Sequence, residues 1–171
     1  MSEVVIAKVA NEKGLGRLIQ SHDSPDLIPG VSVQPYRSFP DDRGYFLEVA
    51  RLGSELAQVS AALSYPGTIK AFHFHKHQTD LWVPVQGMFQ VALVDLREGS
   101  TTLGLRNTMY VGALRTWRIT IPPGVGHGYK VIGVNAAMLV YVTNRYYDPS
   151  DEGRIAWNDP GINYDWDTQH K

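Results

Sequence analysis

The feature that most constrains this chain is a series of short β-type segments separated by turn residues. The segments are rich in Val, Ile, Tyr, Phe, Trp or Thr, which are enriched in strands. No segment shows the sustained apolar period of about 3.6 residues that indicates an amphipathic helix. Many short strands predict an all-β sandwich or barrel. The predicted strands are residues 45–50, 68–75, 81–86, 88–96, 116–121, 128–132 and 137–144.

A length of 171 residues predicts one domain with a single core. Residues 1–29 are expected to form a partly ordered N-terminal extension, since much of this stretch is polar and Pro25 and Pro29 favour a loop. Residues 30–144 are the predicted barrel. A short helical turn is expected at residues 53–58, at the periphery of the barrel.

Residues 145–171 lose the strand pattern and are rich in aromatic residues, Asp and Pro. Large aromatic side chains are costly to leave in water. We therefore expect an ordered tail packed on the barrel through Trp157, Tyr164 and Trp166.

The composition limits the classes of partner. The formal net charge is −1, so neither a nucleic acid nor a membrane partner is expected. No apolar run reaches the length of about 18 residues that marks a membrane-spanning helix, and residues 1–14 lack the apolar centre of a signal peptide. The chain has no cysteine, which rules out disulfide and thiolate chemistry. This fits the cytoplasmic location that we expect.

A cluster of histidines is the most informative site feature. Residues 71–82, AFHFHKHQTDLW, hold three of the six histidines. Side chains alternate along a strand, so His73 and His75 are predicted to point to the same face, with Asp80 on the next strand after a turn. His127 follows a second turn. These residue types leave three possibilities, which are a metal site, a proton-transfer site and crowded core.

The spacing of the cluster resembles the two motifs of the cupin barrel. This resemblance implies an all-β fold of the cupin type, a double-stranded β-helix or jelly-roll barrel. In metal-binding cupins two histidines, an acid and a later histidine hold one divalent ion. If a metal is present here, the implied ligands are His73, His75, Asp80 and His127. The two motifs read Gly67-x5-His73-x-His75-x4-Asp80-x6-Gly87 and Pro122-x-Gly124-x-x-His127.

The flanking residues narrow this resemblance. From about Gly30 to Trp166 the chain resembles the dTDP-4-dehydrorhamnose 3,5-epimerases, which work without a metal. Six matches come in order along the sequence. They are DRGYFLE at 42–48, Gln58, GMFQVALVDLREGSTTLG at 87–104, IPPGVGHGY at 121–129, YVTNRYYDP at 141–149 and EGRIAWNDP at 152–160.

The resemblance implies an isomerase that removes a proton beside the ketone of a nucleotide-linked sugar and returns a proton to the opposite face. It places His73 as the base and Tyr141 as the acid, and it implies a homodimer and no cofactor. The implied substrate is a nucleotide-diphosphate sugar, a dTDP-linked 4-keto-6-deoxyhexose. The implied substrate-binding residues are Arg43, Phe46, Glu48, Gln58, Lys70, His127 and Tyr147.

The chain departs from the family inside the implied site. Lys70 replaces a phosphate-binding arginine, which keeps the charge but loses the bidentate fork. His75 replaces a glutamine, and Asp80 replaces the lysine that faces the enolate. No segment resembles the one that carries the family aspartate orienting the base, so Asp80 or another carboxylate is a candidate for that role. The His-x-His-Lys sequence is similar to the sugar 3,4-ketoisomerases, in which two histidines move protons.

Three functions follow. The favoured one is a metal-free nucleotide-sugar epimerase or isomerase with His73, His75, Asp80 and Tyr141 in the catalytic site. The second is a metal-dependent cupin enzyme with three histidines and one aspartate as ligands. The third is a non-catalytic cupin that binds a sugar or nucleotide.

Overall fold

The computed structural model describes residues 4–42, 44–50 and 58–167. Within these ranges every regular element is a strand, and no helix is long and apolar enough to cross a membrane. The strands are β1 (Arg17–Leu18), β2 (Ser32–Pro35), β3 (Ser38–Asp41), β4 (Gly44–Leu47), β5 (Gln58–Ser64), β6 (Ile69–His75), β7 (Asp80–Gln86), β8 (Met88–Asp95), β9 (Arg106–Gly112), β10 (Trp117–Ile121), β11 (Val125–Ile132), β12 (Ala137–Thr143) and β13 (Glu152–Arg154).

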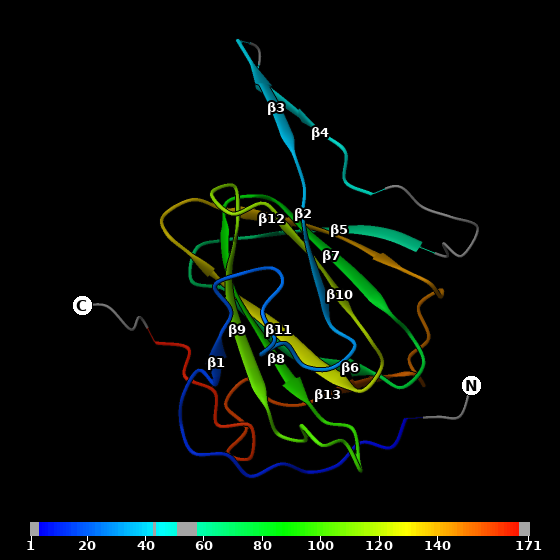
Figure 1. Ribbon diagram of the computed structural model, residues 1–171. Coiled ribbons are helices and arrows are strands. Elements are labelled where there is room, and N and C mark those ends of the chain that lie inside the picture. The colour runs from blue at the N-terminus through cyan, green and yellow to red at the C-terminus, as the bar shows by residue number, and fades with distance from the viewer. Residues whose placement is uncertain (1–3, 43, 51–57, 168–171) are drawn as a thin grey trace.

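Two sheets face each other across the main core (Figure 1). The six-stranded sheet has the order β1-β9-β8-β11-β6-β13, and the five-stranded sheet has the order β2-β10-β7-β12-β5. The core between them takes Leu93 and Met109 from the first sheet and Ile119 and Leu139 from the second. The architecture is the all-β sandwich that the alternating segments predict.

The chain passes from the five-stranded sheet to the six-stranded sheet at Gly87, which lies between β7 and β8. Its φ of 71° lies in the left-handed region that favours glycine. A Cβ atom there would lie 2.6 Å from Cβ of Ala137, so a larger residue would clash with β12. The first cupin-like motif therefore ends at a residue that fixes the corner of the sandwich.

An irregular pairing between β6 and β11 shapes the site. His127 pairs with His73, but Tyr129 pairs with Lys70, so two steps along β11 match three steps along β6. An extra residue of this kind is a β-bulge, and it reverses the alternation of side chains along the strand. Lys70 and His73 consequently reach the same cavity, although their odd spacing would put them on opposite faces of a regular strand.

A hairpin of two strands lies outside the two main sheets. Strands β3 and β4 pair only with each other and project away from the barrel (Figure 1). Phe39, Tyr45 and Phe46 are exposed on it. The strand predicted at 45–50 thus belongs to this arm rather than to the barrel. The helical turn predicted at 53–58 lies outside the described residues except for Gln58, which begins β5.

Both ends of the described chain pack on the sandwich. Ile19 and Ile28 are fully buried in the main core, and β1 pairs in parallel with β9. In the C-terminal segment, Tyr164 and Trp166 pack with Phe72 in a second apolar cluster. Trp157 differs from Tyr164 and Trp166 in that 51% of it is exposed. Its backbone carbonyl oxygen still accepts a hydrogen bond from the indole nitrogen of Trp166.

Candidate active site

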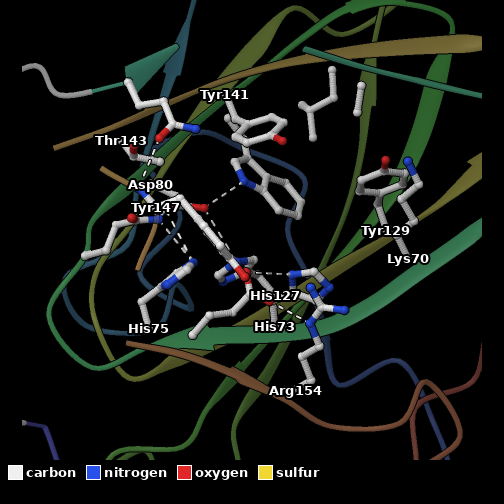
Figure 2. A pocket seen from close by; sticks show the side chains of 16 residues that line it. Lys70, His73, His75, Asp80, His127, Tyr129, Tyr141, Thr143, Tyr147 and Arg154 are labelled. Carbon is white, nitrogen blue, oxygen red and sulfur yellow. Dashed lines mark hydrogen bonds and ion pairs between the residues drawn. The ribbon is translucent and has the colours of Figure 1, made fainter. Parts of the chain in front are cut away.

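A cavity of about 380 Å³ lies between the two sheets and collects most of the predicted site residues. Figure 2 shows their side chains turned toward a common space. The wall from the six-stranded sheet carries Lys70, His73, His75, His127, Tyr129, Glu152 and Arg154. The opposite wall, from the five-stranded sheet, carries Gln58, Asp80, Trp82, Tyr141 and Thr143, and Gln78 and Tyr147 come from loops.

Two of the predicted binding residues in the described part of the chain do not line this cavity. Phe46 is 68% exposed on the projecting hairpin, and Glu48 follows directly after β4. Arg43 lies outside the described residues. Within a single chain, therefore, the hairpin is separate from the histidine cluster.

His73 stands at the edge of the cavity, with 39% of its side chain exposed. Its Nδ1 lies 3.9 Å from Oε2 of Glu152 on β13. The other oxygen of that carboxylate accepts a hydrogen bond of 2.6 Å from Nε of Arg154. Burial lowers the pKa of His73, and the charge of Glu152 opposes this shift. A lowered pKa favours the neutral imidazole, which is the form that accepts a proton.

Deeper in the cavity three buried groups converge. Nε2 of His75 lies 3.9 Å from Oδ1 of Asp80, and Nε2 of His127 lies 3.6 Å from Oδ2 of the same carboxylate. The ligand atoms of the three residues all lie within 4.8 Å of one another. Burial lowers the pKa of His127, although the carboxylate of Asp80 opposes this effect. The predicted four-residue cluster is thus divided into a buried group of three and a more exposed His73.

Hydrogen bonds fix the orientation of the buried group. The amide nitrogen of Gln78 donates to Oδ1 of Asp80 at 2.7 Å, and the indole nitrogen of Trp82 lies 3.3 Å from Oδ2. The same amide nitrogen lies 3.2 Å from Nε2 of His75. Nδ1 of His127 is 3.0 Å from the carbonyl oxygen of Val125. Because a carbonyl oxygen only accepts, the proton of neutral His127 is on Nδ1.

Asp151 holds the turn that joins β6 to β7. Its carboxylate accepts the backbone N–H groups of Lys76, His77 and Gln78. Its Oδ2 also lies 3.7 Å from Nδ1 of His75, an atom that is buried without a hydrogen bond. The turn expected between His75 and Asp80 is present, and a side chain far along the sequence stabilises it.

Tyr141 lies on the wall opposite His73. It pairs with Trp82 across β12 and β7, and Figure 2 shows the ring of Tyr141 in the upper part of the view. Close to it, Oε1 of Gln58 accepts the backbone N–H of Tyr147 at 3.0 Å. The cavity therefore has a histidine on one sheet and a phenol on the other.

Several cavity residues were not identified from sequence. Glu152 and Arg154 occur in a segment that was assigned to tail packing, and their pairing with β6 joins residues far apart in the chain. Gln78 and Trp82 flank Asp80 at two-residue spacing, so the alternation of β7 was the available signal for Trp82. Tyr129 follows His127 by two residues and carried the same signal; its hydroxyl lies 3.0 Å from Oγ of Ser64.

Comparison with known proteins decides the family. The family model described as dTDP-4-dehydrorhamnose 3,5-epimerase matches residues 26–171. This chain belongs to that family. It is 42% identical over 151 residues to the spore coat polysaccharide biosynthesis protein SpsL of Bacillus subtilis, covering 85% of this chain and 100% of the relative. It is 31% identical to a dTDP-4-dehydrorhamnose 3,5-epimerase of Pseudomonas aeruginosa, covering 83% and 84% of the two chains.

Solved structures of this family share the fold. A dTDP sugar isomerase from Desulfovibrio desulfuricans superposes with a TM-score of 0.77 at 25% identity, over 81% of this chain and 92% of that one. A 3,5-epimerase from Legionella pneumophila in complex with dTDP-4-keto-L-rhamnose gives a TM-score of 0.72 at 25% identity, over 81% and 79% of the two chains. The predicted fold, family and class of enzyme, a carbohydrate epimerase of the isomerase type, are confirmed.

Proposed function

We propose that this member of the family acts on a dTDP-linked 4-keto-6-deoxyhexose and inverts a carbon beside the ketone. The observation that supports this most directly is the position of two groups on opposite walls of one cavity. His73 projects from the six-stranded sheet and Tyr141 from the five-stranded sheet. Inversion needs a base on one face of the sugar ring and an acid on the other.

The proposed reaction has two proton transfers. His73 removes the proton from the carbon beside the ketone. The electrons of the broken C–H bond form a C=C bond, and the π electrons of the ketone move onto its oxygen to give an enolate. Tyr141 then donates its hydroxyl proton to the opposite face of that carbon, and the C=O bond forms again. The proton taken by His73 and the one lost by Tyr141 exchange with solvent, so the enzyme returns to its starting state.

The nucleotide end of the substrate needs positive charge and an aromatic surface. Lys70 lines the cavity, and Arg154 stands beside His73 with 69% of its side chain exposed. We assign the diphosphate to these two cations, since Lys70 lines the cavity and Arg154 bonds Glu152 through Nε alone, which leaves its other guanidinium donors for a ligand. Gln58 and Tyr147 are proposed to contact the nucleoside, in keeping with their hydrogen bond at the rim.

Deuterium exchange tests the proposed function. The protein is incubated in D₂O with dTDP-, GDP- and CDP-linked 4-keto sugars, and incorporation beside the ketone is followed by mass spectrometry and NMR. We expect incorporation with the dTDP sugar, and a fall of about 10²–10⁴ in its rate for His73→Asn with nucleotide binding retained. Nucleotide binding without exchange for any sugar would instead establish a non-catalytic binding protein.

We also propose that the protein is a homodimer of the cytoplasm. The outer face of the five-stranded sheet is apolar at its β5 edge, where Val59 is 58% and Leu63 is 53% exposed. An apolar sheet face with an open edge is suited to a two-fold partner. The hairpin that carries Phe46 extends beyond its own barrel, so Arg43, Phe46 and Glu48 are assigned to the partner's nucleotide site. The cytoplasmic location follows from the substrate, because nucleotide sugars are made inside the cell.

A further inference from the structure

We propose that His75, Asp80 and His127 bind one divalent transition-metal ion, and that His73 is not a ligand. The geometry of the three groups supports the site independently of the reaction. The role that we give the ion, which is to stabilise negative charge on the substrate, rests on the proposed function.

The distances suit a small ion. Bonds of about 2.0–2.1 Å at tetrahedral angles place two ligand atoms roughly 3.4 Å apart. The two histidine nitrogens lie 3.9 Å and 3.6 Å from different oxygens of Asp80, and one ligand atom from each of the three residues lies within 4.8 Å of the others. Movement of these side chains toward a common centre would bring them to bonding distance of one ion. Two histidines and one carboxylate are a ligand set used by zinc and non-haem iron sites that keep positions open for substrate.

The lone pairs of the buried groups face one another. Val125 takes the Nδ1 hydrogen of His127, so the lone pair of Nε2 faces the carboxylate of Asp80. Two acceptors at 3.6 Å repel unless a cation or a proton lies between them. A hydrogen bond from Nδ1 of a ligand histidine to a backbone carbonyl is also a common second contact in metal sites.

Asp80 is held in the way that a ligand carboxylate is held. Gln78 and Trp82 donate to its two oxygens, and each oxygen keeps a further lone pair. Gln78 also donates to Nε2 of His75, since an amide nitrogen cannot accept. This contact is the one that an ion would replace, while the bond from Gln78 to Asp80 remains.

The charge of the site is unbalanced in the metal-free chain. Asp80 is 5% exposed, and in the described part of the chain its ion-pair partners are the two histidines, with no lysine or arginine among them. A buried carboxylate is costly unless it is paired. A divalent ion supplies the missing positive charge, and an enolate formed in the same cavity needs that charge as well. The ion thus takes the place of the lysine that resemblance to the family puts at position 80.

Metal binding is tested with the full chain, stripped with chelator and titrated with Zn²⁺ by calorimetry and with Co²⁺ by visible absorption. We expect one ion per chain and a Co²⁺ spectrum of four- or five-coordinate character. His127→Gln and Asp80→Asn should each weaken binding by at least about a hundredfold, whereas Asp80→Glu should retain measurable binding. The matched control is His77→Gln, which removes a histidine of the adjacent turn and should bind the ion like the unaltered chain.

A second comparison separates this proposal from the proposed function. His73→Asn should bind Zn²⁺ normally and lose deuterium exchange, because it is the base and not a ligand. Full exchange activity in chelated protein that binds no Zn²⁺ at millimolar concentration would overturn the metal site and leave the epimerase intact. Tight binding of one ion with no exchange on any sugar would support the metal site and contradict the proposed epimerase function. Equal loss of the ion in His77→Gln and His127→Gln would also overturn the assignment of ligands.

Discussion

Oε2 of Glu152 lies 3.9 Å from Nδ1 of His73, across the neighbouring strands β13 and β6. The carboxylate is held from the other side by Arg154 at 2.6 Å. A carboxylate at Nδ1 favours the proton on that nitrogen and leaves Nε2 free to act as a base. Among the described residues, Glu152 is the carboxylate that we propose orients His73, a role that sequence analysis left to Asp80 or another carboxylate.

Replacing Glu152 tests this positioning role. Glu152→Gln should lower kcat roughly ten- to a hundredfold with little change in KM, which is less than the loss of about 10²–10⁴ that follows removal of the base itself. Glu152→Asp keeps the charge and should recover part of the rate. The measurement is steady-state epimerisation with the dTDP sugar. An unchanged kcat in Glu152→Gln would contradict the role.

Tyr141→Phe should separate exchange from inversion. Without the phenol, His73 still removes the proton and can return a solvent deuteron to the same face, so deuterium enters the sugar while the configuration stays the same. The expected result is exchange at a rate near that of the unaltered enzyme and a fall of about 10²–10⁴ in epimer formation. NMR of the product in D₂O reports both quantities. If both fall together, Tyr141 also takes part in removing the proton.

Asp95 makes the stability of the protein depend on pH at the acidic end. Burial disfavours its charge, but hydrogen bonds from Arg97, Thr102 and Ser100 outweigh burial and lower the pKa of Asp95 to about 2. Its pKa in the unfolded chain is about 3.9. The stabilisation is therefore complete above about pH 5 and is lost as the pH falls through about 2.

Urea unfolding at a series of pH values measures this effect. The free energy of unfolding should fall by about 2 kcal/mol through this group between pH 5 and pH 2, at 1.36 kcal/mol for each unit of pKa difference. Asp95→Asn should be less stable at pH 6 and should lose this part of the pH dependence. The same slope in the variant would assign the effect to other carboxyl groups.

The proposed dimer depends on the apolar outer face of β5. Leu63→Lys places a charge in the proposed interface, and we expect the mass measured by sedimentation at micromolar concentration to fall from dimer to monomer. Leu114→Lys is the matched control, since Leu114 is 88% exposed on a loop and should leave the dimer intact. A monomeric mass for the unaltered protein would contradict the assembly.

The strands that were found from sequence are those with long β-branched or aromatic runs. Strand β8 is such a case, and β11 was found in its C-terminal half. Strands β5 (QVSAALS) and β9 (RNTMYVG) were missed, because Ala, Ser and Asn contribute little strand propensity and what gives these strands their form is pairing with neighbours distant in the chain.

The candidate site was predicted in its residue types and only partly in its arrangement. Spacing and resemblance found His75, Asp80 and His127, which do converge. They did not separate His73 from this group, since that division depends on how β11 and β6 are paired. Glu152 was not identified for a similar reason: it lies beside His73 only because β13, more than seventy residues further along the chain, pairs with β6 at the edge of the sheet.

The extra residue in β6 has a consequence for redesigning this enzyme. Lys70 reaches the cavity because the bulge opposite Gly128 reverses the direction of the side chains between Lys70 and His73. The position of the Lys70 side chain therefore depends on the number of residues between Lys70 and His73 and not only on the identity of residue 70. Deleting one residue between these two positions would keep both side chains in the sequence yet turn Lys70 to the outer face. Transplanting a regular strand from another barrel would remove the proposed phosphate contact in the same way.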